Sequence, residues 1–219
     1  MRRADFDAAI VDLDGTLVDT VGDFVVALGR MLAELGLPPV DAGFVARTVG
    51  RGSEHLIRRT LEAVGADAAA LYDDAWARYQ HHYLAINGRH SAGYAGVREG
   101  LAALQARGRK LACLTNRPTA FAEPLLRDKG LAEFFSVVRG GDACERKKPD
   151  PLPLVRTCEA LGTAPARTLV IGDSRNDAQA ARAAGARVVL VTYGYNHGEP
   201  VRGVDADGWV DRLDELALA

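Results

Sequence analysis

The sequence predicts an α/β protein: a Rossmann-like parallel sheet between two layers of helices, with a helical insertion after the first strand. From about residue 89 onward, short apolar runs alternate with helical patterns that end at glycine, as in strands joined by crossover helices. Between residues 18 and 88, apolar side chains instead recur at helical spacing. We therefore expect an α/β core of residues 1–17 and 89–219, and a helical domain of residues 18–88.

Five short apolar runs predict the strands of the core. The first, at 8–11, contains no polar residue, which is typical of a strand buried on both faces. The other runs lie at 110–115, 134–138, 168–171 and 187–191. Helices are expected between them at about 97–107, 119–129, 151–161 and 177–184.

The insertion is predicted to begin with a helix at Thr20. Asp23 follows three residues later, the spacing of a capping box. Further apolar stripes at helical spacing run from 56 to 64 and from 72 to 86. The segment 87–96 is rich in glycine and polar residues, and we expect it to be a hinge back to the core.

Composition excludes several classes of function. The 219 residues carry a formal net charge of -2 with scattered Lys and Arg, so no broad face for nucleic acid is indicated. No stretch has the apolar length of a membrane span, and residues 1–7 lack the apolar region of a signal peptide. The three cysteines match no metal spacing and are expected to be reduced. We expect a cytoplasmic protein, a monomer or homodimer, whose partner is a small molecule.

Polar side chains follow the predicted strands at the points where the strands end. Asp12 follows the first strand, Thr115 ends the second, Lys148 lies in the loop after the third, and Asp173 follows the fourth. The carboxyl ends of parallel strands meet at one edge of a sheet, where ligands bind in such folds. The sequence therefore predicts that these four segments form one site.

The residue types in this site suit phosphoryl transfer. Asp12, Asp14 and Asp173 offer the oxygen ligands that Mg²⁺ prefers, and a cation would relieve their mutual repulsion. Lys148 adds positive charge, and the hydroxyl of Thr115 can donate a hydrogen bond to a phosphate oxygen. Such charge balance is what the transfer of a phosphoryl group requires.

Four motifs in this order resemble those of the haloacid dehalogenase-like hydrolases. They are an Asp-x-Asp-Gly-Thr segment at 12–16, Thr115 with Asn116, Lys148 before a proline, and a Gly-Asp-x-x-x-Asp segment at 172–177. The resemblance implies that Asp12 is a covalent nucleophile that forms an aspartyl-phosphate. It also implies that residues 18–88 form a mobile cap.

The same resemblance implies roles for the other motif residues. Asp14 would protonate the leaving alkoxide and then activate water, while Thr115 and Lys148 would hold the phosphoryl oxygens. Mg²⁺ would be bound by Asp12, by the backbone carbonyl of Asp14 and by Asp173. Asp177 would orient the metal shell or Lys148; the alternative, that it caps the helix that follows, is compatible with this role.

Within the family, the chain resembles bacterial phosphoglycolate phosphatases in segments 94–99, 115–118, 123–126, 147–154 and 192–198. This implies a phosphoric monoester hydrolase acting on a small phosphorylated metabolite, 2-phosphoglycolate first. Asn116 is expected to contact the substrate, and Arg51 could bind its carboxylate or be a solvated loop residue. Arg117 stands where Lys is common, and the two are not equivalent if the side chain touches substrate.

Other functions remain open from the sequence. Phosphatases of sugar phosphates, including N-acetylmuramic acid 6-phosphate, share versions of these segments, and pyrophosphate is a further candidate. A phospho-accepting signalling domain also combines acidic residues, Thr and Lys on a parallel sheet. It would not need a helical insertion or a second aspartate at position 14.

Overall fold

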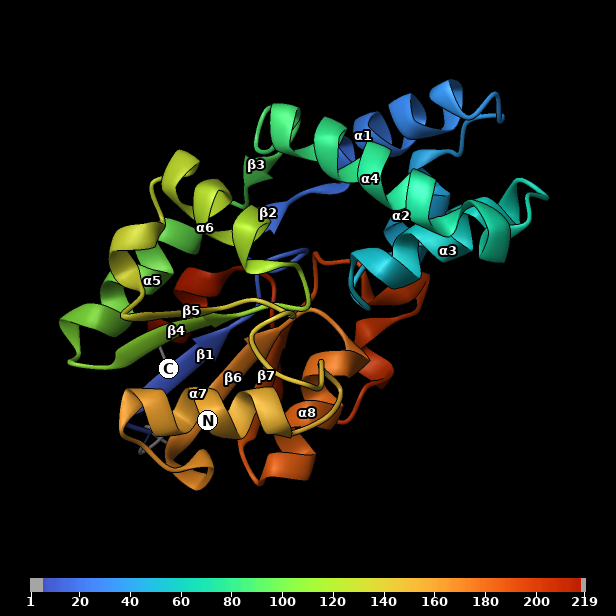
Figure 1. The fold of residues 1–219 in the computed structure, drawn as a ribbon. Coiled ribbons are helices and arrows are strands. Elements are labelled where there is room, and N and C mark those ends of the chain that lie inside the picture. The colour runs from blue at the N-terminus through green and yellow to red at the C-terminus, as the bar shows by residue number, and fades with distance from the viewer. Residues whose placement is uncertain (1–5, 218–219) are drawn as a thin grey trace.

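A six-stranded sheet forms the centre of the computed structural model, which describes residues 6–217 (Figure 1). Its strands are β1 (Ala8–Val11), β4 (Lys110–Leu114), β5 (Val137–Arg139), β6 (Thr168–Gly172), β7 (Arg187–Val191) and β8 (Gly208–Val210). The strand order is β5-β4-β1-β6-β7-β8, and all neighbours are parallel. The order of connections reverses between β1 and β6, which is the switch point where doubly wound sheets bind ligands. Residues 1–5, part of the predicted core and of the segment compared with a signal peptide, lie outside the described residues.

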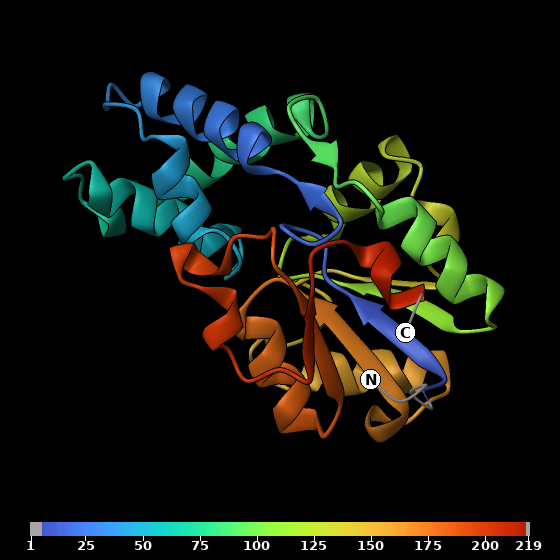
Figure 2. The ribbon, with the colours of Figure 1, turned by 180° about the vertical axis from the view of Figure 1, so that it is seen from behind.

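Helices cover both faces of the sheet (Figures 1 and 2). They are α5 (Val97–Ala106), α6 (Thr119–Asp128), α7 (Leu152–Leu161) and α8 (Arg175–Ala184). The side chains of β1 alternate: Ala9 and Val11 pack in one apolar cluster with α5 and α6, whereas Ala8 and Ile10 pack in another with α7 and α8. The predicted three-layer α/β/α core is therefore confirmed.

Two parts of the core differ from expectation. The run at 134–138 begins with a 3₁₀ turn, η1 (Ala132–Phe134), so β5 starts only at Val137. The edge strand β8 was not predicted because its three residues are too few to show a period. The other 3₁₀ turns are η2 (Pro165–Arg167), η3 (Asn196–Gly198), η4 (Val201–Gly203) and η5 (Leu213–Ala217).

The predicted insertion is helical and lies beyond the carboxyl ends of the strands (Figure 1). Its helices are α1 (Val21–Glu34), α2 (Ala42–Thr48), α3 (Ser53–Ala63) and α4 (Ala68–Ile86). They share an apolar cluster of their own that includes the fully buried Tyr79 and Tyr83. Phe121 of α6 joins this cluster, with its ring centroid 4.9 Å from that of Tyr83. That residues 18–88 move as a separate domain stays a prediction.

The two crossings between insertion and core lie side by side. β2 (Val18–Asp19) pairs antiparallel with β3 (Ala92–Gly93) in a small separate sheet. These strands hold the outgoing chain against the returning one, so both chain crossings lie at a single place. The predicted hinge 87–96 contains β3.

The predicted capping box at the start of α1 is wrong. Thr20 is the N-cap residue, but its hydroxyl donates to Asp14 Oδ1 at 2.6 Å instead of capping the helix. Asp23 accepts from the backbone N–H groups of Gly88 and His90 at 2.8 and 2.7 Å. The two side chains therefore connect the helix to the active-site edge and to the returning chain.

Two expectations about the whole chain can be compared with the described part. Cys113, Cys144 and Cys158 are all free, as expected for reduced thiols. Within residues 6–217, none of the helices combines the length and the apolar character that crossing a membrane requires.

Candidate active site

The carboxyl ends of the central strands bring the predicted side chains to one edge of the sheet. Asp12 follows β1, and Asp173 follows β6 beside it. Thr115 follows β4 on the other side of β1. Lys148 arrives from the loop between β5 and α7 and is buried. The sheet order thus makes neighbours of segments that are far apart in the sequence.

Lys148 lies at the centre of this group. Its Nζ is 2.9 Å from Asp12 Oδ1 and 2.7 Å from Asp177 Oδ1, and it donates to the carbonyl of Leu114 at 2.8 Å. Burial lowers the pKa of Lys148, but the charges of Asp12 and Asp177 raise it more, and the net shift is upward. The ammonium therefore stays charged and can face an anion.

Asn116 positions Lys148 through both ends of its side-chain amide. Its Oδ1 accepts from the Lys148 N–H at 2.9 Å, while its Nδ2 donates to the Lys148 carbonyl at 2.8 Å and to the Gly50 carbonyl at 2.9 Å. The side chain is therefore engaged with protein groups, and the predicted contact of Asn116 with substrate stays a prediction.

Three buried carboxylates lie close enough to share a cation. Oxygens of Asp12, Asp173 and Asp177 all lie within 4.8 Å of one another. Burial raises the pKa of Asp173 to about 7, and the charge of Asp177 adds to the rise. Burial also raises the pKa of Asp12 well above its usual range, against the opposing charge of Lys148. Apart from Lys148 Nζ at 2.9 Å, Asp12 Oδ1 has no hydrogen-bond donor among the described residues, so the group has acceptor capacity that suits Mg²⁺.

Asp177 combines the two roles that the sequence left open. Its Oδ2 accepts from the N–H and hydroxyl of Ser174 at 3.3 and 2.9 Å, which completes a capping box at the start of α8. Its Oδ1 pairs with Lys148. The capping interaction therefore fixes the carboxylate that holds Lys148.

Glycines allow the backbone to approach these carboxylates. A Cβ on Gly194 would lie 2.2 Å from Asp173 Cβ, and one on Gly15 would lie 2.2 Å from Asp173 Oδ2. Gly15 also has φ +79, a conformation that other residues rarely adopt. Asp173 is thus enclosed by backbone, and the N–H of Tyr195 donates to its Oδ2 at 2.7 Å.

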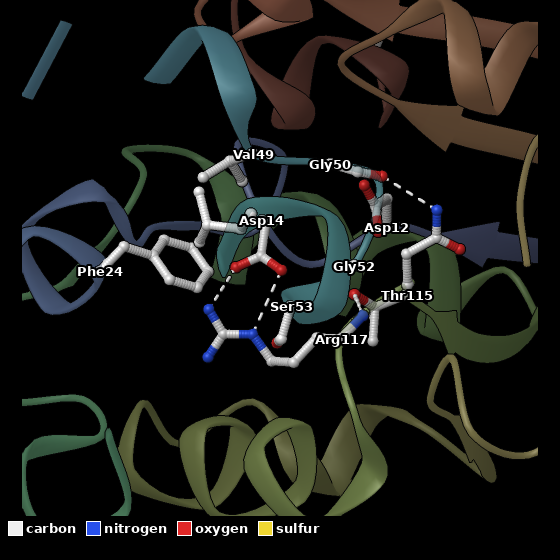
Figure 3. Close-up of a pocket in the computed structure, with 11 residues that line it drawn as sticks. Asp12, Asp14, Phe24, Val49, Gly50, Gly52, Ser53, Thr115 and Arg117 are labelled. Carbon is white, nitrogen blue, oxygen red and sulfur yellow. Dashed lines mark hydrogen bonds and ion pairs between the residues drawn. The ribbon is translucent and has the colours of Figure 1, made fainter. Parts of the chain in front are cut away.

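Asp14 does not join the acidic group with its side chain. Its carboxylate turns toward Arg117, whose Nη2 lies 2.5 Å from Oδ1 and whose Nε donates to Oδ2 at 3.2 Å (Figure 3). Both side chains are buried, with 2% of Arg117 and 9% of Asp14 exposed. A metal contact through the Asp14 backbone carbonyl stays a prediction.

A cavity of about 20 Å³ opens between the sheet edge and the insertion (Figure 3). It is lined by Asp12, Asp14, Phe24, Val49, Gly50, Gly52, Ser53, Leu56, Thr115, Asn116 and Arg117. This volume holds little more than one water. Arg51 lies outside this lining, in a separate hollow of about 400 Å³ with Arg47, His55 and Arg175. The arginine that the structure places at the cavity is therefore Arg117.

Tyr195 takes a part in the site that the sequence did not specify. Besides its backbone bond to Asp173, its hydroxyl donates to Asp19 Oδ1 at 2.7 Å and accepts from the N–H of Thr20 at 2.7 Å. It thus joins the loop after β7 to the start of the insertion. From the sequence, this tyrosine could border the cleft or pack the loop after the last strand.

Comparison with known proteins identifies the family. The sequence model described as haloacid dehalogenase-like hydrolase matches residues 9–191, which include every motif of the site. The chain belongs to this family. This match confirms the resemblance to the family that the four motifs indicated.

Several relatives of this haloacid dehalogenase-like hydrolase are named phosphoglycolate phosphatases. A phosphoglycolate phosphatase of Thiobacillus denitrificans is 46% identical over 176 residues, covering 80% of this chain and 78% of the relative. One of Cupriavidus necator is 44% identical over 181 residues, covering 83% and 78%. Among solved structures, a predicted phosphoglycolate phosphatase from Haemophilus somnus has a TM-score of 0.88 at 31% identity, covering 98% and 97%. CbbY from Rhodobacter sphaeroides in complex with phosphate has a TM-score of 0.83 at 27% identity, covering 96% of each chain.

Proposed function

We propose that this chain is a Mg²⁺-dependent phosphatase that converts 2-phosphoglycolate to glycolate and phosphate through an aspartyl-phosphate on Asp12. The observation that carries the reaction class is the pairing of Asp12 with the buried Lys148, 2.9 Å apart at the switch point of the sheet. The substrate is supported by relatives of 46% and 44% identity that are named phosphoglycolate phosphatases.

The reaction takes place in two displacements at phosphorus. An oxygen of Asp12 attacks phosphorus, and the bond from phosphorus to the glycolate oxygen breaks with its electron pair on the leaving oxygen. Asp14 gives a proton to that oxygen. Water then attacks the phosphorus of the aspartyl-phosphate, Asp14 takes a proton from the water, and the carboxylate of Asp12 is released.

Neighbouring groups balance the charge of the phosphoryl oxygens. The ammonium of Lys148 provides fixed positive charge beside the nucleophile. Thr115 Oγ accepts the N–H of Arg117 at 3.1 Å, so its own hydrogen can be donated to a phosphoryl oxygen. Asp12 and Asp173 would hold Mg²⁺ together with the backbone carbonyl of Asp14. When bound, Mg²⁺ supplies the positive charge that lets an anionic ester approach a carboxylate.

The insertion of residues 18–88 acts as a cap over this site. Its loop before α3 contacts the core at Gly50, whose carbonyl accepts from Asn116 and from Asn176 at 2.9 and 3.1 Å. Lys147 of the core also pairs with Glu54 of the insertion at 2.5 Å. These contacts support a closed state in which water is excluded, with opening at 87–96 needed to admit substrate.

Sugar phosphates are the second candidate substrates. CbbY, solved in complex with xylulose-(1,5)bisphosphate, is 26% identical to this chain with a TM-score of 0.82. N-acetylmuramic acid 6-phosphate and pyrophosphate belong in the same comparison. A stable phospho-accepting signalling domain is a weaker candidate, because it has no use for an acid/base at Asp14. We also propose a cytoplasmic monomer or homodimer, which size-exclusion chromatography with light scattering would resolve.

A panel of phosphate esters tests the proposed function. Phosphate release would be measured from 2-phosphoglycolate, sugar phosphates and pyrophosphate, with Mg²⁺ and with EDTA, and Asp12→Asn purified in parallel would control for contaminating phosphatases. We expect Mg²⁺-dependent turnover that is highest in kcat/KM for 2-phosphoglycolate. Equal activity on generic esters would remove the specific substrate, and a long-lived phosphorylated chain without turnover would favour the signalling domain.

A further inference from the structure

The side chain assigned to acid/base catalysis is held by other groups in this structure. Asp14 Oδ1 accepts from Arg117 Nη2 at 2.5 Å and from the Thr20 hydroxyl at 2.6 Å. Asp14 Oδ2 accepts from Arg117 Nε at 3.2 Å. Both oxygens are thus occupied by donors, and the two-pronged contact fixes the plane of the carboxylate. Asp14 must leave Arg117 before it can reach a leaving oxygen.

The insertion holds Arg117 from the opposite side. The Arg117 guanidinium carbon lies 4.8 Å from the ring centroid of Phe24 on α1 and 5.0 Å from that of Tyr83 on α4. Its Nη1 also donates to the Tyr83 hydroxyl, and to Asn87 Oδ1 at 3.5 Å. The guanidinium is therefore fixed by aromatic rings and hydrogen bonds, and Asp14, on a loop, is the partner that can move.

Arg117 also faces the place where a substrate must bind. It lines the cavity of about 20 Å³ next to Asp12 and Thr115, and it is the one cation among the residues that line this cavity in the described chain (Figure 3). That volume does not accommodate a phosphate ester while the insertion lies closed on the core, so the lining must rearrange when substrate enters. A turn of Asp14 away from Arg117 would be part of this rearrangement.

We propose that the anionic end of the substrate replaces Asp14 on Arg117 and thereby releases Asp14 for proton transfer. This inference rests on the proposed function and names the substrate class. The substrates are phosphate esters in which one carbon separates the carboxylate from the ester oxygen. The substrate carboxylate takes over the pairing of the buried guanidinium, so Arg117 is not left unpaired, and Asp14, no longer held by Arg117, can carry the proton that it gives to the leaving oxygen. An ester without a carboxylate would have to leave Arg117 buried and unpaired to free Asp14, which is unfavourable. Arg117 is thus both a binding residue for the acid and the residue that restrains Asp14.

Paired substrates and variants separate this exchange from simple binding. The esters are 2-phosphoglycolate and 2-hydroxyethyl phosphate, which has a hydroxymethyl group in place of the carboxylate. In Arg117→Gln, kcat/KM for 2-phosphoglycolate should fall by on the order of 100-fold, mostly in KM. The kcat for 2-hydroxyethyl phosphate should rise by about 3-fold or more, because Asp14 is no longer restrained. Arg117→Lys should keep part of the preference for the acid, since it retains the charge but not the fork.

A matched control guards against a general effect of losing an arginine. Arg58 also lies over an aromatic ring, 3.8 Å from the centroid of Tyr72, but on the insertion away from the cavity lining. Arg58→Gln should have the same kcat and KM as the wild type for both esters. If Arg117→Gln lowers kcat/KM for both esters by the same factor, the residue is merely structural and the exchange is wrong.

A second measurement needs no variant and so does not depend on folding. Acetate is added to the wild-type enzyme hydrolysing methyl phosphate, which is short enough to leave the position at Arg117 free. Acetate on Arg117 should release Asp14 and raise kcat by about 3-fold or more. The gain should be smaller than the gain from a carboxylate that is part of the substrate, because free acetate must be bound from solution. Inhibition by acetate, or no effect, would contradict the proposal.

The outcomes also distinguish this proposal from the proposed function. If the wild type shows no Mg²⁺-dependent turnover of any ester, the proposed function fails. If it hydrolyses 2-phosphoglycolate well, but acetate does not activate and Arg117→Gln does not change the preference between the two esters, only the exchange at Arg117 is overturned.

Discussion

Asp23 carries a prediction about how the insertion is attached to the core. The side chain is fully buried and accepts from the N–H groups of Gly88 and His90 at 2.8 and 2.7 Å. Asp23→Ala leaves two backbone donors without their partner. At about 1.5 kcal/mol for each buried donor that loses its hydrogen bond, the free energy of unfolding should fall by about 3 kcal/mol. For a chain of this length that corresponds to a drop in Tm of about 6–12 °C.

Urea unfolding at equilibrium measures this loss, and the two tryptophans report on different parts of the chain. Trp76 lies on α4 in the insertion, whereas Trp209 lies on β8 in the core. Single Trp→Phe variants would assign the fluorescence change to each part. Because Asp23 joins α1 to the returning chain, Asp23→Ala should lower the midpoint reported by Trp76 at least as much as that reported by Trp209.

An exposed aspartate that also accepts a hydrogen bond from a backbone N–H provides the control. Asp41 caps α2 by accepting the N–H of Phe44 at 2.6 Å, and it is exposed to solvent. Asp41→Ala should cost about 1 kcal/mol, as for other helix caps. If Asp23→Ala costs no more than Asp41→Ala, the reasoning that burial makes the two donors at Gly88 and His90 expensive to leave unpaired is refuted.

Three further predictions concern the site. Asp12→Asn should abolish turnover and leave no phosphorylated chain in mass spectra, while Asp14→Asn should slow both formation and hydrolysis of the phosphoenzyme in rapid-quench experiments; near-normal turnover of Asp12→Asn would disprove the nucleophile. Saturating Mg²⁺ at about 100 times its Kd should stabilise the wild type by about 2.7 kcal/mol in a thermal melt, and more at pH 8 than at pH 6, because protons compete for Asp173, whose pKa is about 7. Asp173→Asn should lose most of this response, and an equal response in both proteins would place the cation elsewhere. Gly194→Ala should weaken Mg²⁺ binding in calorimetry, because its Cβ would lie 2.2 Å from Asp173 Cβ; unchanged affinity would show that the loop adjusts freely.

The sheet could be predicted because its strands are buried on both faces. Segments such as 8–11 and 169–171 are continuous apolar runs, and the rule for parallel sheets then places Asp12 and Asp173 at the same edge. That inference needs only the order of strands and helices. The three-residue strand β8 lies at the sheet edge with β7 as its one neighbour, and so short a segment carries no periodic signal.

The side-chain partners could not be predicted where they depend on long-range docking. Thr20 and Asp23 have the spacing of a capping box, but the structure gives each a partner outside the helix, at Asp14 and at the 88–90 segment. Local spacing does not show such partners. The choice between Arg51 and Arg117 as the arginine at the cavity likewise depends on how the insertion lies on the core, which one sequence does not reveal.

The charges at the sheet edge explain why a cation belongs there. Asp12, Asp173 and Asp177 carry three negative charges against the single ammonium of Lys148, so two negative charges stay uncompensated when all three are ionised. Burial and the neighbouring carboxylates raise the pKa values of Asp12 and Asp173, which means that the free protein relieves this imbalance with protons. A divalent cation would relieve it fully and release those protons. Asp14 and Arg117 balance each other separately, so an arriving carboxylate that takes Arg117 can free Asp14 without disturbing the balance around Asp12.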